Sequence, residues 1–232
     1  PKNFRNFYGR LKGKGLRALQ QKLLNDQLEK LSIPAVKYEI NPDRKLIELS
    51  DLFKNVTSFS LEIGFGGGEH LVYQAERNPN IGFIGCEPYI NGVAMLAGKL
   101  SKTELTNVRI HPGDVRDLFD VLPDDSIDSV YLLYPDPWPK KRHHRRRFVT
   151  SEYLIDLQRV MKTGALLKLA TDIPDYVRQS LQEICKHHFS WTATDAQDWR
   201  ECWSDWMPTR YERKALREGR RPYYLTFEKR ES

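Results

Sequence analysis

The sequence predicts an open α/β fold, in which a mostly parallel sheet carries helices on both faces. Short apolar runs typical of buried strands alternate with stretches of helical periodicity along most of the chain. Several of these runs end in glycine or in an acidic residue, as strands that lead into a ligand site do. No internal repeat interrupts the alternation. With 232 residues, the chain can bury the core of one large α/β domain.

Composition and charge narrow the partners that the protein can have. Lys and Arg exceed Asp and Glu, 37 against 31, which gives a formal net charge of +6. The basic residues gather in three segments, at 2–22, 140–147 and 210–221, a distribution that permits a polyanion such as RNA as partner. No apolar run approaches the ~20 residues of a membrane span, so we expect no membrane association.

Cysteine and histidine usage bears on compartment and metal binding. Cys86, Cys185 and Cys202 are odd in number and form no C-x-x-C pair, which favours a reducing cytoplasmic compartment. The six histidines show no spacing typical of a metal site, so we expect no metal. The sequence leaves the oligomeric state open, with a monomer slightly favoured.

Residues 1–32 are interpreted as a basic N-terminal arm, and residues 33–232 as a single domain. Arg5, Arg10 and Arg17 stand among aromatic residues and glycines, a composition that resists folding on its own, so we expect a mobile arm. A disordered terminus and an RNA-contacting arm remain equally open. Leucines at helical spacing predict a short helix within 16–31, and residues 35–40 are predicted as a strand.

The remaining elements alternate along the domain. The apolar patterns predict strands over 58–63, 81–86, 108–111, 127–134, 165–170 and 222–227. They predict helices over 47–53, 69–75, 93–100, 152–161 and 174–188. For Trp199, Trp203 and Trp206, which follow these helices, we expect internal packing rather than stacking on bases.

A glycine turn between the strand over 58–63 and the next helix indicates a ligand site. Gly64, Gly66, Gly67 and Gly68 let the chain turn sharply and let a ligand approach the backbone beside a helix N-terminus. Glu87 ends the second strand about 20 residues after Gly68, the spacing at which an acidic residue meets ribose hydroxyls. Nicotinamide-binding and methyl-donor-binding proteins share this start.

Acidic residues at strand ends favour the methyl donor. Glu62, Glu87, Asp114 and Asp136 lie at or near the carboxyl ends of four successive strands, the edge at which open α/β sheets bind ligands. Glu69 stands where the nicotinamide fingerprint has glycine or alanine, and a carboxylate there would repel a pyrophosphate. S-adenosylmethionine has no phosphate and carries two cationic groups, so an acid-rich site suits it.

The segment 131–147 brings a carboxylate, an aromatic ring and a basic cluster together. Pro135 and Pro137 restrict the residues before them, so we expect Asp136 in a stiff, extended loop after a strand. Trp138 offers a face for stacking, and residues 140–147 hold six Lys or Arg and two His. A solvated loop is the ordinary alternative for a basic run. The clustering at one strand end favours instead a place where chemistry meets a polyanion.

Several motifs, in their order along the chain, resemble signature blocks of the bacterial tRNA (guanine-N7)-methyltransferase family. They are Glu62-Ile63-Gly64-Phe65-Gly66, Pro135-Asp136-Pro137-Trp138-Pro139-Lys140, Thr171-Asp172 and Thr209-Arg210-Tyr211-Glu212. The resemblance implies a Rossmann-like class I methyltransferase fold, with a mostly parallel seven-stranded sheet whose last strand runs antiparallel. It also implies methyl transfer from S-adenosyl-L-methionine to guanine N7 in the variable loop of tRNA, a tRNA modification.

The resemblance implies roles for individual residues as well. Those expected at the cofactor are Glu62, Gly64, Gly66, Glu87, Asp114 and Asp136. Those expected at the guanosine are Lys140, Asp172, Thr209, Arg210, Tyr211 and Glu212. Those expected to grip RNA are Arg142, His143, His144, Arg145, Arg146 and Arg147.

The chemistry of guanine limits what a catalytic residue has to do. Neutral guanine N7 has a free lone pair, so attack on a sulfonium methyl group needs no general base. We therefore expect Asp136 to orient the reactants and to stabilise developing charge. A non-catalytic RNA-binding module with the same fold is the alternative, and in such a module the four acids would be dispensable.

Overall fold

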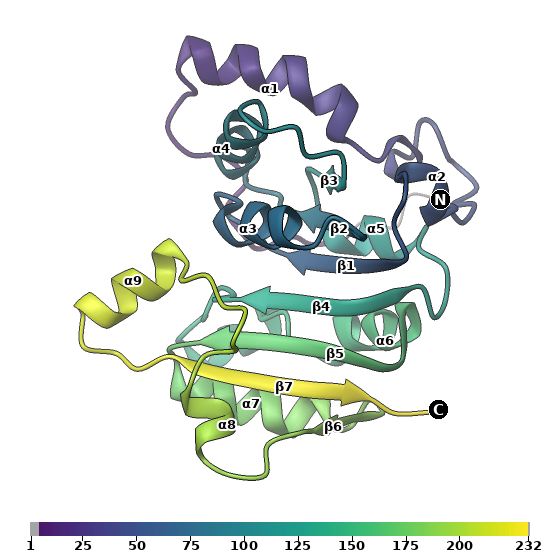
Figure 1. Ribbon diagram of the computed structural model, residues 1–232. Helices are drawn as coiled ribbons and strands as arrows, with labels where there is room; N and C mark the ends of the chain where they lie inside the picture. Colours follow the sequence, from purple (N-terminus) through teal and green to yellow (C-terminus); the bar gives the residue numbers. More distant parts are fainter. Residues whose placement is uncertain (1–4, 232) are drawn as a thin grey trace.

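The computed structural model describes residues 5–231, and its centre is a seven-stranded sheet (Figure 1). The strands are β1 (Ser58–Ile63), β2 (Ile81–Cys86), β3 (Val108–His111), β4 (Ile127–Leu133), β5 (Met161–Thr171), β6 (Phe189–Trp191) and β7 (Tyr223–Lys229). Across the sheet their order is β3-β2-β1-β4-β5-β7-β6. Strands β1 to β5 pair in parallel, whereas β7 is antiparallel to both neighbours. The expected sheet, with its antiparallel last strand, is confirmed.

Helices cover both faces of the sheet, as the alternating sequence pattern predicts (Figure 1). They are α1 (Ala18–Leu31), α2 (Leu49–Leu52), α3 (Glu69–Arg77), α4 (Ile90–Leu100), α5 (Val115–Phe119), α6 (Ser151–Val160), α7 (Pro174–Ile184), α8 (Gln197–Arg200) and α9 (Arg210–Arg217), with 3-10 turns η1 (Pro34–Val36) and η2 (Lys141–Arg146). Within the described part of the chain, no helix is long and apolar enough to cross a membrane.

Alternate strand residues bury the two faces in separate cores. On β4, Val130 and Leu132 join the core that α5, α6 and α7 cover. Tyr131 and Leu133 point to the other face, where they pack with residues of the tryptophan-rich C-terminal segment. The helices α1, α3 and α4 cover the remainder of that second face. Because both faces are buried, most strands read as apolar runs, and the predicted strands lie at or near observed ones. Strand β5, however, begins at Met161 rather than at 165, and β6 was not predicted as a strand.

The strand predicted over 35–40 is wrong. Pro34 begins the 3-10 turn η1 there, since its fixed φ suits the first position of a helical turn. The side-chain amide of Asn41 then donates to the carbonyls of Ala35 and Lys45, which closes the segment as a loop. Val36 is buried, so its apolar character serves loop packing rather than strand pairing.

The predicted leucine helix is confirmed as α1, which packs along α4. Leu24 and Leu31 are its buried residues. Described residues of the arm before it also contact the domain, Arg5 through Asp120 and Asn6 through Arg116. The division of the chain at residue 32 and the mobility of the arm stay predictions.

Candidate active site

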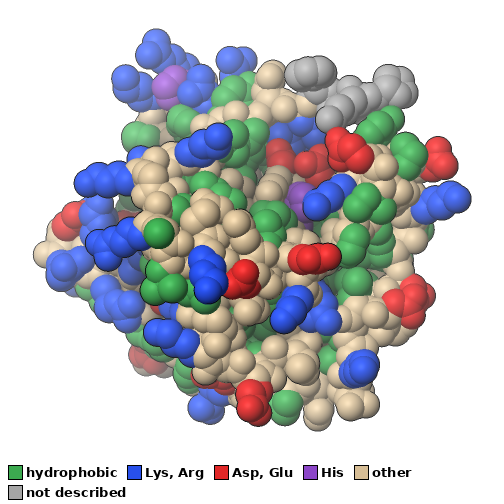
Figure 2. Space-filling model, turned by 90° about the horizontal axis from the view of Figure 1, so that it is seen from above, with side chains coloured by type: hydrophobic (Ala, Val, Ile, Leu, Met, Phe, Trp, Pro, Cys, Tyr) green, Lys and Arg blue, Asp and Glu red, His purple; other side chains and the backbone are tan. Residues whose placement is uncertain are grey.

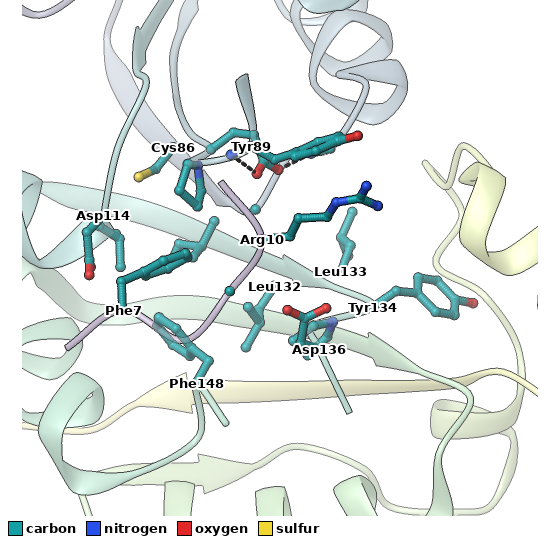
Figure 3. A pocket seen from close by; sticks show the side chains of 18 of the residues that line it. Phe7, Arg10, Cys86, Tyr89, Asp114, Leu132, Leu133, Tyr134, Asp136 and Phe148 are labelled. Carbon is teal, nitrogen blue, oxygen red and sulfur yellow. Dashed lines mark hydrogen bonds between the residues drawn. The ribbon is translucent and has the colours of Figure 1, made fainter. Parts of the chain in front are cut away.

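A cavity of about 490 Å³ opens at the carboxyl edge of the sheet, where β1 to β4 end (Figure 3). The sheet order reverses direction at β1, and such switch points are where open α/β sheets bind ligands. The volume is within the range of small-molecule sites. Predicted cofactor residues that line it are Gly64, Gly66, Glu87, Asp114 and Asp136.

The glycine turn after β1 forms one wall of the cavity. Gly64, Gly66 and Gly68 have φ of 74°, 56° and 74°, in the left-handed region that favours glycine. A Cβ built on Gly92 would lie 2.2 Å from the carbonyl oxygen of Gly66, so α4 packs directly against the turn. Side chains at Gly64 or Gly66 would take up space in the cavity. Side chains at Gly68 or Gly92 would collide with the packing between the turn and α4.

Glu87 follows β2 and is held by backbone N–H groups of two different loops. The amide of Gly66 donates to Oε2 at 2.6 Å, and the amide of Tyr89 donates to Oε1 at 2.9 Å. Burial of Glu87 raises the pKa of its carboxyl to about 7, although these hydrogen bonds oppose the rise. Each oxygen keeps a lone pair for a further donor, so the carboxylate can accept from ribose hydroxyls.

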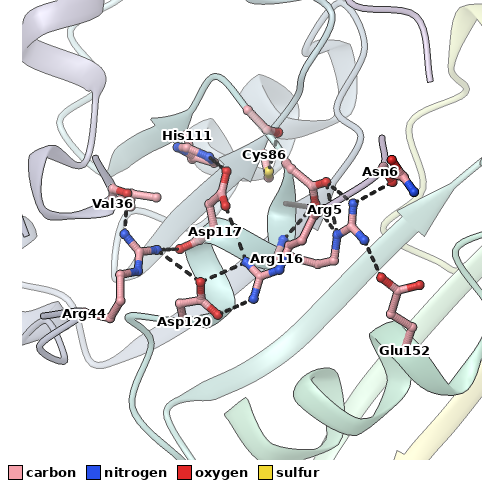
Figure 4. A network of polar contacts seen from close by, with 12 residues as sticks. Arg5, Asn6, Val36, Arg44, Cys86, His111, Arg116, Asp117, Asp120 and Glu152 are labelled. Atoms are coloured by element: carbon pink, nitrogen blue, oxygen red, sulfur yellow. Dashed lines mark hydrogen bonds and ion pairs between the residues drawn. The ribbon is translucent and has the colours of Figure 1, made fainter. Parts of the chain in front are cut away.

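Asp114 follows β3 and is fixed by the first turn of α5. Its Oδ1 accepts from the amide of Arg116 at 2.9 Å, and its Oδ2 accepts from the Arg116 guanidinium at 2.6 Å. That guanidinium also contacts Glu152 and donates to the carbonyl of Asn6 at 3.0 Å (Figure 4). Arg116 therefore links a cavity carboxylate to the N-terminal arm.

Asp136 lies in a loop that turns at both ends rather than running extended throughout. Tyr134 and Trp138, on either side of the two prolines, have left-handed φ of 52° and 40°. The Tyr134 amide donates to the carbonyl of Ala170 at 2.7 Å, which ties the loop to β5. Partial desolvation raises the pKa of the Asp136 carboxyl above its ordinary value. The loop thus aims a carboxylate into the cavity (Figure 3).

The N-terminal arm also lines the cavity, a role that the sequence analysis missed. Phe7, Tyr8, Gly9 and Arg10 contribute to the lining. The guanidinium of Arg10 lies over the ring of Tyr89, 5.6 Å from its centroid. The aromatic residues interleaved with arginines are visible in the sequence, but they fitted a disordered terminus and an RNA-contacting arm equally well.

Two charge-assisted hydrogen bonds hold Arg5, the first residue of the arm that the structure describes (Figure 4). The Arg5 guanidinium donates to both carboxylate oxygens of Asp120, at 2.8 and 2.7 Å. Farther along, Gly13 donates to the side chain of Asn91 at 2.9 Å. The arm is thus attached on both sides of the residues that line the cavity.

Glu62 does not line the cavity, although it was predicted as a cofactor residue. Its side chain is buried and lies 2.8 Å from Nδ1 of His70 on α3. His70 in turn packs against the rings of Tyr131 and Trp206. Side chains alternate along β1, and this alternation points Glu62 toward α3.

The residues predicted at the guanosine divide into two groups. Arg210 and Tyr211 line the cavity, whereas the other four do not: Lys140, Asp172, Thr209 and Glu212. Thr209 caps α9, with its hydroxyl accepting from the Glu212 amide at 3.2 Å. Glu212 is buried and accepts from Tyr224 at 2.8 Å and from Trp206 at 2.7 Å. Both residues therefore shape the start of α9.

Asp172 and Lys140 lie outside the cavity for different reasons. The Asp172 carboxylate is mostly covered and pairs with the guanidinium of Arg220. Lys140 is exposed and precedes the turn η2. A contact of either residue with a guanosine stays a prediction.

The basic loop places its charges unevenly. Lys140, Lys141, Arg142 and Arg145 are exposed, whereas His143, His144 and Arg146 are half-buried. Arg146 lies over the rings of Tyr8 and Trp138 and lines the cavity. Figure 2 shows Lys and Arg side chains gathered on the left of the molecule, the side on which Figure 1 places α9.

Arg147 is buried, which does not fit its expected role in gripping RNA. Only 1% of the residue is exposed. Its guanidinium donates to the carbonyl of Pro137 at 2.7 Å, to Gln179 at 2.8 Å and to Asp175 at 2.8 Å. These bonds hold the Asp136 loop against α7.

The three tryptophans near the C-terminus pack within the protein, as expected. Trp199 stacks on Tyr223, with ring centroids 5.9 Å apart. Trp203 and Trp206 contact each other and Tyr224 edge to face. None of them lines the cavity.

The fold is that of the class I methyltransferases. Solved structures with this fold include an antibiotic-related methyltransferase (TM-score 0.58, 18% identity, covering 81% of this chain and 98% of that chain). They also include the 16S rRNA methyltransferase KamB (TM-score 0.59, 15% identity, 79% and 93%). At these identities the likeness shows the fold alone.

Sequence relatives give the family. A family model described as "Putative methyltransferase" matches residues 57–225. The tRNA (guanine-N(7)-)-methyltransferase of Roseobacter denitrificans is 61% identical over 223 residues, 96% of this chain and 95% of that protein. The proteins of the same name from Ruegeria pomeroyi and Agrobacterium fabrum are 60% and 47% identical, covering 98% and 97% of this chain and 95% of each relative. The chain belongs to the tRNA (guanine-N7)-methyltransferase family.

Proposed function

We propose that this protein transfers a methyl group from S-adenosyl-L-methionine to N7 of a guanosine in the variable loop of tRNA. The observation that carries the proposal is the place of Asp136, in a fixed loop between the acid-lined cavity and the basic segment 140–147. Family membership supports the methyl transfer and the tRNA substrate. Three free cysteines and a tRNA substrate favour a cytoplasmic location.

The cavity fits the proposed cofactor on chemical grounds. Glu87 can accept from ribose hydroxyls, and Asp114 lies one strand farther along, on the side expected for the purine. The carboxylates also suit a ligand with two cationic groups. Gly64 and Gly66 line the cavity and have no side chains, so a ligand can approach the backbone of the turn closely. When bound, the cofactor supplies the methyl group on its sulfonium.

The residues around Asp136 position the reactants rather than move a proton. Guanine N7 attacks through its own lone pair, so no base has to remove a proton beforehand. The Asp136 carboxylate can accept from guanine N–H groups and stabilise the positive charge that methylation places on the purine. The rigid loop supplies orientation, because Tyr134 and Arg147 tie its two ends to β5 and α7.

Exposed cations beside the cavity are proposed to hold the RNA backbone. Arg142 and Arg145 lie in the same loop as Asp136 and face solvent. Such residues neutralise phosphates and position the nucleic acid without reading its sequence. Recognition of the variable loop would then depend on the distance between these contacts and the cavity.

Transfer of a labelled methyl group to unmodified tRNA, followed by mapping of the product, tests the proposal. We expect the label on N7 of one guanosine in the variable loop. Label on another nucleotide would retain the methyltransferase and reject the position. Tight tRNA binding with no transfer by the folded protein would indicate a non-catalytic binding module instead.

A further inference from the structure

Arg210 begins helix α9, and its guanidinium lies against the glycine turn. Its Nη2 lies 3.5 Å from the position that a Cβ on Gly66 would occupy. Nη2 also donates to the Tyr211 hydroxyl at 3.2 Å, and Nη1 contacts the sulfur of Met95 at 3.6 Å, a weak acceptor. Nε is buried and has no hydrogen-bond partner within the residues described. A half-buried guanidinium with so few acceptors around it can donate hydrogen bonds to an acceptor group of a ligand.

The order of the strands indicates which part of the cofactor faces Arg210. Glu87 follows β2 and is placed for the ribose, and Asp114, after β3, lies on the side to which the proposed function assigns the purine. The 5′ substituent of the ribose must then extend the other way, past the turn after β1 toward Asp136 after β4. In S-adenosylmethionine that substituent is the methionine group. It therefore passes the turn that the Arg210 guanidinium contacts.

The methionine group carries an ammonium and an α-carboxylate, which need opposite partners. Carboxylates and carbonyls of the cavity can receive the ammonium. The α-carboxylate needs donors, but the amides of Gly64, Gly66 and Gly68 already donate to other groups of the protein, at 2.7, 2.6 and 2.8 Å. These three amides are therefore not available to bind an anion.

The other two cations that line the cavity are placed elsewhere. Arg10 lies over the ring of Tyr89, with Nε donating to the carbonyl of Lys12 at 3.0 Å. Arg146 lies over the ring of Trp138, 5.0 Å from its centroid, beside the loop of Asp136. Among the described residues that line the cavity, Arg210 is the cation at the glycine turn.

We infer that the Arg210 guanidinium anchors the α-carboxylate of the cofactor. The planar fork of guanidinium donors matches a carboxylate and can hold it through two hydrogen bonds. The inference rests on the proposed function, because it takes S-adenosylmethionine as the ligand. It moves Arg210 from the guanosine, where the family resemblance places it, to the cofactor.

Decarboxylated S-adenosylmethionine, which lacks only the α-carboxylate, tests the anchor directly. Calorimetric titration of the full chain without tRNA compares its affinity with that of S-adenosylmethionine. For the unaltered protein we expect a preference of about 10- to 100-fold for S-adenosylmethionine, as for a hydrogen-bonded charge pair. Arg210→Gln should bind the two compounds about equally. Arg210→Lys should fall between, because it keeps the charge and loses the fork.

Two controls separate the anchor from general damage. Arg213→Gln removes the same charge one turn farther along α9, from an exposed side chain that does not line the cavity, and should keep the full preference. 5′-Methylthioadenosine lacks the whole amino-acid group. It should bind the unaltered protein and Arg210→Gln with similar affinity, which shows that the rest of the cavity is intact.

Three results would overturn the inference. A preference of tenfold or more that persists in Arg210→Gln places the carboxylate against another residue. Normal cofactor discrimination with a loss of tRNA affinity returns Arg210 to the guanosine. If the unaltered, folded protein binds none of the three adenosine compounds, the proposed cofactor is itself wrong and the inference fails with it.

Discussion

The strand-end wall of the cavity and the basic loop beside it hold their charges in different ways. Glu87 and Asp114 each accept backbone N–H groups, so the main chain fixes where their carboxylates lie. In the basic loop, Arg142 and Arg145 face solvent, and only neighbouring side chains and ligands can restrain them. The wall is preorganised for one small ligand, whereas the loop can adapt to a phosphate backbone. Substitutions should therefore affect chemistry on one side and RNA affinity on the other.

The largest effect is expected at Asp136, where the two regions meet. Asp136→Asn keeps the size of the side chain but removes the charge that would stabilise the methylated purine. We expect kcat to fall by about 10²- to 10³-fold, with cofactor affinity changing much less. Single-turnover kinetics with tRNA measure the first quantity, and calorimetry measures the second. Asp26→Asn, on the exposed side of α1, is the matched control. Normal turnover in Asp136→Asn would remove this residue from the reaction.

Two neighbouring arginines of the basic loop should behave oppositely. Arg147→Ala removes the hydrogen bonds of a buried guanidinium, so the free energy of unfolding should fall by about 2–4 kcal/mol. Arg145→Ala should change it by less than about 0.5 kcal/mol. It should instead weaken tRNA binding and lower the salt dependence of the affinity by about 0.9 for each phosphate that the side chain no longer neutralises. Chemical denaturation and tRNA titrations at several salt concentrations measure both. Equal free energies of unfolding for the two variants would mean that the buried hydrogen bonds of Arg147 do not stabilise the fold.

Arg145 and Arg147 show which features of the protein can be predicted from its sequence and which cannot. Strand positions and strand-end acids follow from local patterns, because a buried parallel strand is apolar along its length and ends at a defined edge. The fate of a single arginine in a run of six cations depends on Gln179 and Asp175 of α7, which are distant in the sequence. Composition predicts the charge of a loop, but not which member turns inward.

Contacts between distant segments also explain the other differences between the predicted and the observed site. The Glu62 side chain forms a buried contact with His70, because α3 places His70 beside it. The periodicity of the strand alone does not predict this contact. The arm reaches the cavity through Arg5 and Asn6, whose partners lie more than a hundred residues away. Local signals find elements and turns, whereas contacts between distant segments depend on the assembled fold.

The raised pKa of Glu87, in the wall of the cavity, predicts that the affinity for the cofactor depends on pH. Hydroxyl donors and a nearby sulfonium favour the carboxylate form, so cofactor binding lowers this pKa from about 7. Binding then releases a proton when the pH is below about 7, and affinity falls as the pH falls. Between pH 8 and pH 6 we expect about a tenfold loss of cofactor affinity. Calorimetry across this range should give a flat profile for Glu87→Gln. A flat profile for the unaltered protein would contradict the assignment.

The smallest effect is expected from the arm, which belongs to neither region but touches both. Arg5→Ala removes its bidentate contact with Asp120, a partly exposed ion pair, so the arm should leave the cavity more often. Because residues 7–10 line the cavity, cofactor dissociation should accelerate by about threefold, in line with the strength of such a pair. Stopped-flow displacement measures this rate, and Lys22→Ala, on the exposed side of α1, serves as the control.

A double substitution sharpens the interpretation of the arm. If Arg5 acts through Asp120, then Arg5→Ala combined with Asp120→Ala should accelerate dissociation no more than either change alone, because both remove the same contact. Additive effects would mean that Arg5 influences the cofactor by another route, such as the nearby Asp117. An unchanged rate in all three variants would mean that the arm does not cover the bound cofactor. In that case the residues that line the cavity from the arm would serve the RNA instead, and tRNA affinity rather than cofactor release should respond to Tyr8→Ala.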